Sequence, residues 1–181
     1  MYFNTIISGF GGQGVMFMGN LLAYAAMKAG RQVTYMPVYG VEMRGGTANC
    51  TVVISDKPVG SPIVHKPVSA VVMNNPSAEK FGPMVKKNCL LLVNSSLVEH
   101  KYVQTRTKRI LSIPSLQLAN EVGNSRLANM VMLGALVQIS GLVEVEQVVK
   151  CLPEVLDPRY HKMISVNSAA LRRGADVVTQ G

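Results

Sequence analysis

The sequence feature that most constrains this chain is a glycine cluster near its start. An apolar stretch from Tyr2 to Ser8 leads into Gly9-Phe10-Gly11-Gly12-Gln13-Gly14, and strong helix formers follow from Val15 to Ala29. A strand, a glycine turn and a helix in this order leave backbone N–H groups at the helix start, where they attract an anion such as phosphate. The segment therefore predicts either an anion-binding turn or a tight connection that packs the helix closely on its strand.

After this helix, the chain as far as about residue 115 has mostly the pattern of strands separated by turns. The candidate strands are Val33 to Met36, Ala48 to Ser55, Ser69 to Met73, Cys89 to Asn94 and Arg109 to Ile113. A short helix is expected from Asn75-Pro76 to Lys86, and the later residues are helical, with breaks at Gly141, Pro153 and Pro158. The strand from Tyr2 to Ser8, the helix from Val15 to Ala29 and the strand from Val33 to Met36 form a βαβ unit. We expect one α/β domain over residues 1–181, with three layers, a mostly parallel Rossmann-like sheet and a helical C-terminal part.

The second candidate strand lacks the acid that dinucleotide enzymes use to hold a ribose. Val33-Thr34-Tyr35-Met36-Pro37 contains no Asp or Glu, and the next carboxylate is Glu42. The G-x-x-x-x-G-K-[ST] sequence of triphosphate-binding loops is also missing. Both observations disfavour the common nucleotide-binding enzymes, although an independent nucleotide-binding oxidoreductase domain remains an alternative.

A second group of chemically capable residues follows this strand. Tyr39-Gly40-Val41-Glu42-Met43-Arg44-Gly45-Gly46-Thr47 has no periodicity and sets an acid and an arginine beside two glycines. In a parallel sheet this loop shares the carboxyl edge with the glycine turn, and ligands bind at that edge. Glu42 and Arg44 either brace the loop as an ion pair or present the guanidinium to a phosphate, a carboxylate or a partner chain.

The cysteines and histidines limit which cofactors the chain can hold. Cys50, Cys89 and Cys151 are far apart and form no C-x-x-C pair, so we expect a reduced cytoplasmic chain without an iron–sulfur cluster or structural zinc. The three histidines also lack zinc-site spacing. Neither long uncharged stretch, 1–27 or 127–142, has the character of an export signal or a membrane span. We predict no metal site and no membrane association.

The formal net charge of +8 permits an anionic partner without identifying it. The densest basic run is Lys101, Arg106, Lys108 and Arg109, with only Tyr102 as an interleaved aromatic residue. Single-strand nucleic-acid binders need a stacking platform that this run lacks. We interpret the run as solvated surface or as a contact for an acidic partner or a phosphate-bearing ligand, and we expect no nucleic-acid binding.

Three further features have both a structural and a functional interpretation. Asn94-Ser95-Ser96 follows a strand, so its hydroxyls either cap a turn or reach a ligand, and capping is favoured. Cys50 lies in an apolar run and is expected to be buried and inert. The nearly uncharged helices at 15–29 and 127–142 are predicted to be buried on more than one side, in part by another subunit.

The order of these motifs closely resembles the gamma subunit, or the equivalent fused domain, of the thiamine-diphosphate-dependent 2-oxoacid:ferredoxin oxidoreductases. The matching segments are Gly9 to Val15, Tyr39 to Cys50, Gly60 to Val64, Met73-Asn74, Asn94 to Ser96 and Ala128 to Gly134. The segment Glu42 to Thr47 is more similar to the 2-oxoglutarate type than to the Glu-Arg-Arg-Gly-Ala version of the pyruvate type. Val41 departs mildly from the family, whose members often have proline there.

The resemblance implies a reaction in which a 2-oxoacid, coenzyme A and oxidised ferredoxin give an acyl-CoA, carbon dioxide and reduced ferredoxin. Thiamine diphosphate, Mg²⁺ and the iron–sulfur clusters are then held by thiamine-binding alpha and beta subunits and a ferredoxin-like subunit. This chain is expected to have no catalytic residue and to be inactive alone. The residues expected to contact a cofactor, with coenzyme A as the candidate, are Gly9, Phe10, Gly11, Gly12, Gln13, Gly14, Tyr39, Glu42, Met43, Arg44, Gly45, Gly46, Asn94 and Ser95. A further alternative is a pure assembly module whose glycine turn holds no ligand.

Overall fold

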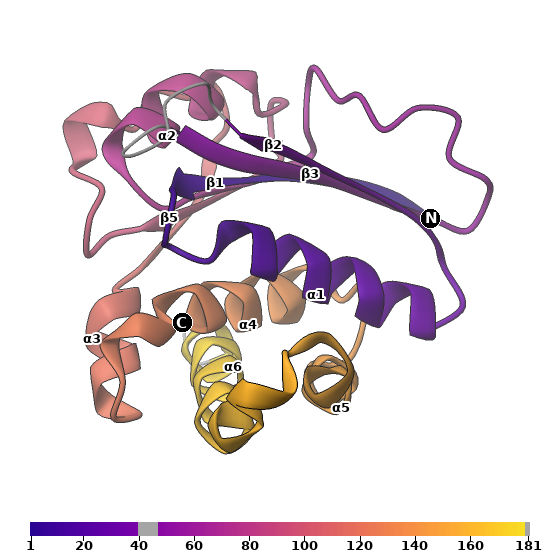
Figure 1. Ribbon diagram of the computed structural model, residues 1–181. Helices are drawn as coiled ribbons and strands as arrows, with labels where there is room; N and C mark the ends of the chain where they lie inside the picture. Colours follow the sequence, from indigo (N-terminus) through magenta and orange to yellow (C-terminus); the bar gives the residue numbers. More distant parts are fainter. Residues whose placement is uncertain (40–46, 180–181) are drawn as a thin grey trace.

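The described part of the chain, residues 1–39 and 47–179 of a computed structural model, forms one sheet with helices on both faces (Figure 1). Its strands are β1 (Tyr2–Phe10), β2 (Gln32–Tyr39), β3 (Thr47–Ser55), β4 (Ser69–Val72), β5 (Leu90–Asn94) and β6 (Arg109–Ile113). Its α-helices are α1 (Val15–Lys28), α2 (Asn75–Phe81), α3 (Ser115–Glu121), α4 (Ala128–Ser140), α5 (Val145–Val155) and α6 (Ile164–Thr179). Short 3₁₀ helices are η1 (Gly82–Met84), η2 (His100–Tyr102), η3 (Ser125–Leu127) and η4 (Pro158–Met163). The predicted α/β class is confirmed.

The sheet is mostly parallel, with one reversed strand near its edge. Its strand order is β2-β3-β1-β4-β5-β6. β1, β4, β5 and β6 pair in parallel, whereas β3 is antiparallel to both β1 and β2. The insertion of β3 between β1 and β2 was not predicted. The antiparallel pairing of β3 with β2 follows from the short connection at residues 40–46, because a parallel connection needs a crossover of a dozen or more residues.

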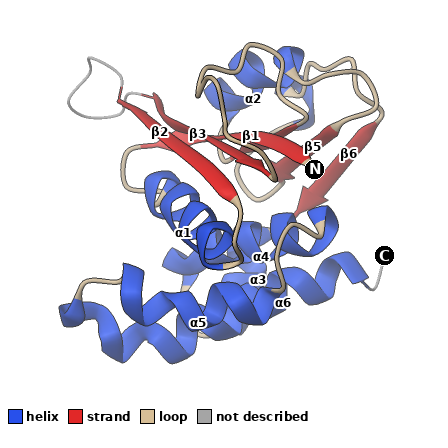
Figure 2. Cartoon of the chain, turned by 90° about the vertical axis from the view of Figure 1, so that its right-hand side faces the viewer, coloured by secondary structure: helices blue, strands red, loops and turns tan. Residues whose placement is uncertain are grey.

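The larger core lies between the sheet and helices α1 and α4. Cys50, Val52 and Ile54 of β3 are fully buried in it, and α4 is buried at ten of its thirteen residues. Helices α5 and α6 cover α1 and α4 from outside, so this side of the sheet is two helices deep (Figures 1 and 2). The predicted burial of α4 is confirmed, but its cover is α6 of the same chain and not another subunit.

Two glycines set the distance between α4 and α6. A Cβ atom added to Gly134 would collide with the backbone carbonyl of Leu171, and one added to Gly174 would collide with that of Val131. Because neither glycine carries a side chain, the two helix backbones approach closely and exclude water from the apolar seam.

A smaller core occupies the opposite face of the sheet, under α2. Phe81, Val85 and Val98 pack there against apolar residues of β1, β4 and β5. Asn74 caps α2 by accepting a hydrogen bond from the Ser77 backbone N–H at 2.9 Å. The helix predicted to reach Lys86 ends at Phe81 and gives way to η1.

The C-terminal helices begin and end mostly where the sequence indicates. Gly141 ends α4 in a left-handed conformation with φ 61°, and Pro158 opens η4. The predicted break at Pro153 was wrong, because this residue lies inside α5. It lies in the last turn, so its missing backbone N–H removes a single intrahelical hydrogen bond, and the helix ends two residues later. Among the described helices, none is both long and apolar enough to cross a membrane.

Candidate functional site

The glycine turn lies at the same edge of the sheet as Tyr39 and Thr47, the two ends of the predicted loop segment. Phe10 at the end of β1 pairs with Thr47 at the start of β3, and Tyr39 at the end of β2 pairs with Ala48. This is the carboxyl edge of the parallel strands, where loops form ligand sites in open α/β sheets. Among the predicted contact residues, Glu42, Met43, Arg44, Gly45 and Gly46 lie outside the described residues, and their roles stay predictions.

The turn between β1 and α1 depends on two glycines in left-handed conformations. Gly12 has φ 99° and Gly14 has φ 72°, values that other residues adopt only with strain. Gly14 is also the N-cap residue of α1, and no side chain caps this end of the helix. The first turn contains no acidic residue. Its backbone N–H groups therefore remain available to an anion, together with the positive end of the helix dipole.

The side chain of Gln13 closes the turn and ties it to β4. Its Oε1 accepts hydrogen bonds from the Phe10 backbone N–H at 2.7 Å and from Asn74 Nδ2 at 3.2 Å. Its Nε2 donates to the Met73 carbonyl at 3.3 Å. Gly9 leaves room for this amide, because an added Cβ would lie 2.5 Å from Gln13 Oε1. Gln13 thus shapes the edge through contacts within the chain.

Ser96 supplies the predicted hydroxyl cap, because its Oγ accepts a hydrogen bond from the Leu116 backbone N–H at 3.0 Å, and the Asn94 amide adds contacts that were not predicted. Asn94 is fully buried, and its Oδ1 accepts hydrogen bonds from Ser115 Oγ at 2.7 Å and from the Ser96 backbone N–H at 3.1 Å. Its Nδ2 donates to the Met73 carbonyl at 3.4 Å. Ser95 is exposed, and its backbone N–H donates to Ile113. Asn94 therefore fixes the ends of β4 and β5, whereas Ser95 faces solvent beside them.

Two hollows flank the glycine turn. One of about 340 Å³ is lined by Phe10, Gly11, Gly12, Gly14, Val15, Met16, Phe17 and Ala48. The other, of about 260 Å³, lies on the side of α3 and α4 and is lined by Gly12, Gln13, Met73, Leu116, Ser125, Arg126, Ala128 and Asn129. Gly12 borders both, so a ligand seated on the helix start can extend to either side.

Arg126 and Asn129 are the residues of this edge that sequence reasoning missed. Arg126 is exposed beside the second hollow. Asn129 is only 8% exposed, its Oδ1 has no hydrogen-bond partner among the described residues, and its Nδ2 occupies the space where a Gly14 side chain would lie. An asparagine in the otherwise apolar stretch 127–137 was the available signal. A buried amide oxygen without a partner is costly, which makes it a candidate ligand contact.

The thiol nearest the glycine turn is unsuited to chemistry. Cys50 donates to the Val15 carbonyl at 3.4 Å, and burial raises the pKa of its thiol to about 12. A thiol with this pKa remains protonated near neutral pH and is a poor nucleophile. Within the described residues, no three His, Cys, Asp or Glu side chains come together as a metal site. Among the described residues, this edge offers backbone N–H groups, two hollows and Arg126.

Comparison with known proteins places this arrangement in context. Residues 4–177 match the family described as pyruvate ferredoxin/flavodoxin oxidoreductase. The chain is 38% identical over 94% of its length to ketoisovalerate oxidoreductase subunit VorA of Methanothermobacter marburgensis, but it spans only 35% of that relative. It is 30% identical over 97% of its length to 2-oxoglutarate synthase subunit KorC of Methanothermobacter thermautotrophicus, and it spans 94% of that protein. The chain thus covers about a third of the VorA relative and nearly all of the KorC relative.

Solved structures show the same fold. The gamma subunit of a keto/oxoacid ferredoxin oxidoreductase from Geobacter sulfurreducens superposes with a TM-score of 0.82 at 26% identity, covering 99% of this chain and 98% of that one. A 2-oxoglutarate:ferredoxin oxidoreductase from Magnetococcus marinus, described with 2-oxoglutarate, coenzyme A and succinyl-CoA bound, superposes with a TM-score of 0.88 at 21% identity. This chain covers 31% of that longer chain, and the likeness shows the fold alone.

Proposed function

Because the chain belongs to the pyruvate ferredoxin/flavodoxin oxidoreductase family, we propose that it is the gamma subunit of a thiamine-diphosphate-dependent 2-oxoacid:ferredoxin oxidoreductase in the cytoplasm. The near-complete coverage of the KorC relatives supports a separate subunit, and the longer VorA relatives support the equivalent fused domain. In the complex, a 2-oxoacid and coenzyme A are converted to an acyl-CoA and carbon dioxide while ferredoxin is reduced.

In this proposal the chain binds and positions, and its partners carry out the chemistry. Thiamine diphosphate and Mg²⁺ belong to the alpha and beta subunits, and the iron–sulfur clusters to these and a ferredoxin-like subunit. The amides of Gln13, Asn74 and Asn94 support a positioning role, because their hydrogen bonds join the glycine turn and the ends of β4 and β5 at the carboxyl edge. Their role is to keep the edge rigid where a ligand or a partner subunit meets it.

The observation that carries a ligand role is the uncapped start of α1 beside two hollows. Backbone N–H groups at this helix start suit a phosphate, and coenzyme A carries phosphates at one end. Arg126 supplies a cation on the other side of Gly12. We assign the phosphates of coenzyme A to this edge, with Tyr39, Glu42, Met43, Arg44, Gly45, Gly46 and Ser95 as further contacts around it.

Two 2-oxoacid classes remain candidates for the substrate. The amino-acid sequence from Glu42 to Thr47 favours 2-oxoglutarate, because it is more similar to the 2-oxoglutarate type of the family. The 38% identity to VorA, against 30–33% to three KorC relatives, favours a branched-chain 2-oxoacid as the second candidate. Comparing turnover of 2-oxoglutarate and 2-oxoisovalerate by the assembled complex decides between them.

Affinity purification followed by calorimetry tests the proposal. Tagged protein, expressed with its neighbouring genes, should bring down thiamine-binding and cluster-bearing chains. The assembled complex should titrate with coenzyme A but not with NAD. Recovery of the chain by itself with saturable NAD binding would favour the independent nucleotide-binding domain, and no heat with either ligand would leave the pure assembly module.

Variants at the edge separate ligand binding from folding. Arg126→Ala and Arg44→Ala should each raise the KM for coenzyme A about tenfold, because a charge-assisted contact to phosphate is lost. Lys150→Ala, which removes a cation from α5, is the matched control and should leave this KM unchanged. Wild-type kinetics in an arginine variant would remove that residue from the site.

A further inference from the structure

The positive charge of the chain is concentrated in one segment of the sequence. Residues 57–109 contain nine Lys and Arg against two Asp and Glu, a net charge of +7 out of +8 for the whole chain. All other residues together are nearly balanced. In the fold this segment runs from the loop after β3 through β4, α2 and β5 to the start of β6, and its helix α2 lies above the sheet in Figure 1.

Six of these cations gather at the amino edge of β4, β5 and β6. Each comes within four residues before its strand or at its first residue, and we call this set the basic edge: Lys66, Lys86, Lys87, Arg106, Lys108 and Arg109. Because β4, β5 and β6 are parallel neighbours, the loops before them lie side by side. The basic edge is thus at the end of the strands opposite to the glycine turn.

Hydrogen bonds hold the three loops against one another. The Lys86 backbone N–H donates to the Pro67 carbonyl at 3.0 Å. The Thr107 hydroxyl donates to the Cys89 carbonyl, and the Arg109 backbone N–H donates to that hydroxyl at 3.1 Å. These bonds link each loop to the next, so the cations share one braced surface.

The cations of the basic edge are exposed and lack acidic partners. All six side chains belong to exposed residues, and none of them forms an ion pair with another residue of the described ranges. Asp56, at the same end of the sheet, pairs with Arg31 and the N-terminal amine, and Glu99 pairs with Lys101. Grouping like charges without internal partners costs free energy through mutual repulsion, and an acidic partner would relieve that repulsion.

An exposed apolar residue lies beside the basic edge. Ile110 of β6 is 42% exposed and directly follows Arg109 in the sequence, and β6 is the outermost strand at its end of the sheet. An exposed aliphatic side chain next to charged residues is typical of a protein–protein contact. Nucleic-acid binders instead present exposed aromatic rings, whereas Tyr102 here is half-buried with Lys101 Nζ 5.0 Å from its ring centre.

From this charge distribution, we propose that the basic edge is a docking surface for the acidic face of another protein, with Ile110 as its apolar contact. This surface is separate from the ligand edge, because strands of four to five residues set the two ends of the sheet about 13–17 Å apart. Association through it depends on ionic strength, since exposed charges are screened by salt.

Fluorescence anisotropy with the purified full chain at low ionic strength tests the proposal. The probes are a peptide of repeated Glu-Glu-Leu, a peptide of repeated Glu-Glu-Ser with the same length, a thymidine oligonucleotide with the same charge, and phosphatidylserine vesicles. The Glu-Glu-Leu peptide should bind most tightly, and its affinity should fall with added salt. Tighter binding of the oligonucleotide or the vesicles would overturn the proposal.

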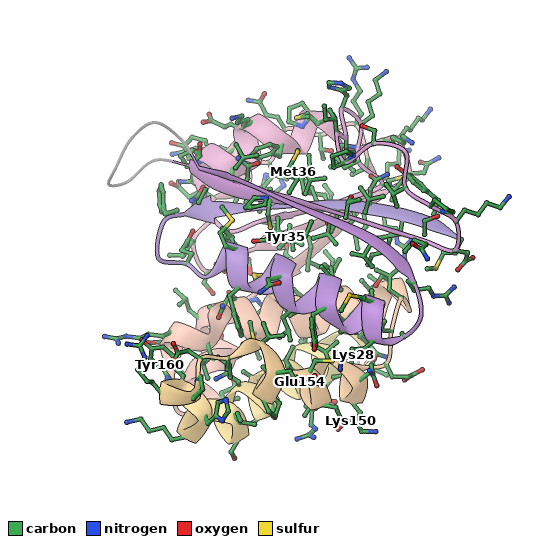
Figure 3. All side chains as sticks on the ribbon, turned by 45° about the vertical axis from the view of Figure 1, so that its right-hand side comes forward. Lys28, Tyr35, Met36, Lys150, Glu154 and Tyr160 are labelled. Carbon is green, nitrogen blue, oxygen red and sulfur yellow. The ribbon has the colours of Figure 1, made fainter. Side chains whose placement is uncertain are left out.

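Charge reversals separate the basic edge from net charge. Lys86→Glu with Lys87→Glu should weaken peptide binding about tenfold. Lys150→Glu with Lys162→Glu changes the net charge equally on the C-terminal helices, where Figure 3 shows Lys150, and should change affinity by about twofold at most. Equal losses in both variants would show that net charge alone attracts the peptide and would refute the docking surface.

A third variant tests the apolar contact. Ile110→Ser should abolish the preference for Glu-Glu-Leu over Glu-Glu-Ser while keeping the salt dependence. An unchanged preference would remove Ile110 from the surface. Circular dichroism establishes that each variant is folded, and Arg106→Glu with Lys108→Glu replaces the first reversal if that variant does not fold.

Discussion

Substituting alanine for the glycines of the turn, one at a time, separates backbone strain from side-chain collision. At Gly11 a Cβ meets nothing within 4 Å and φ is not in the left-handed range, so Gly11→Ala should change the free energy of unfolding by less than about 0.5 kcal/mol. At Gly12 the space is also open, but φ is 99°. Gly12→Ala should therefore cost about 1–2 kcal/mol from the backbone alone.

Gly14→Ala adds a collision to the same backbone cost. Its φ is 72°, and the new Cβ would overlap Asn129 Nδ2. Overpacking of this kind costs about 1–3 kcal/mol, so the total should reach about 2–5 kcal/mol. Adding Asn129→Ala should return the cost to the Gly12→Ala range, because the second change removes the colliding amide.

Urea unfolding followed by circular dichroism measures the four variants and the Asn129→Ala single variant at one temperature. The double-mutant cycle between positions 14 and 129 should give a coupling free energy of at least about 1 kcal/mol. Equal destabilisation by Gly12→Ala and Gly14→Ala, with no coupling to Asn129, would refute the contact between α4 and the glycine turn.

Three further predictions concern the rest of the molecule. Cys50, whose pKa is raised to about 12 by burial, should react with iodoacetamide at pH 8 only after unfolding; rapid labelling at Cys50 in the native chain, located by peptide mass spectrometry because Cys89 is half-buried, would contradict its burial. Gly134→Ala and Gly174→Ala should each lower the free energy of unfolding by about 3 kcal/mol or more, whereas Gly60→Ala, with open space around it, should be nearly neutral in the same urea series. The Arg172 guanidinium lowers the pKa of Glu146 below its ordinary 4.5, so this pair stabilises the fold above pH 4.5 and its contribution is lost as pH falls through the lowered pKa. Glu146→Gln should therefore reduce the fall in thermal midpoint below pH 4.5. An unchanged fall in thermal midpoint would show that the pair does not contribute to acid destabilisation.

The elements with strong local signals were predictable from the sequence. The strand at Arg109–Ile113 was predicted with its observed bounds, and the start of α1 follows directly from Gly14 and the apolar residues after it. The position of β3 was missed because strand patterns do not specify neighbours, although the seven-residue connection after β2 already requires an antiparallel turn. The cover over α4 was missed because Gly134 and Gly174 are forty residues apart in the sequence.

The candidate site was predicted as far as its local motif extends. The glycine turn and the capping hydroxyl of Ser96 follow from short segments. Arg126 and Asn129 reach the same edge only through the packing of η3 and α4 against it, which no local pattern encodes. Tyr39 could be placed at the end of β2, whereas the segment from Glu42 to Gly46 remains a prediction.

The most direct test of whether this chain is a necessary but inactive subunit is a ferredoxin-reduction assay. The assay compares the purified chain alone, its partner subunits alone and the two together. With a 2-oxoacid and coenzyme A supplied, only the combined sample should reduce ferredoxin at the full rate, and the chain alone should show no turnover. Full activity of the partners without this chain, or turnover of a nicotinamide substrate by the chain alone, would contradict the account.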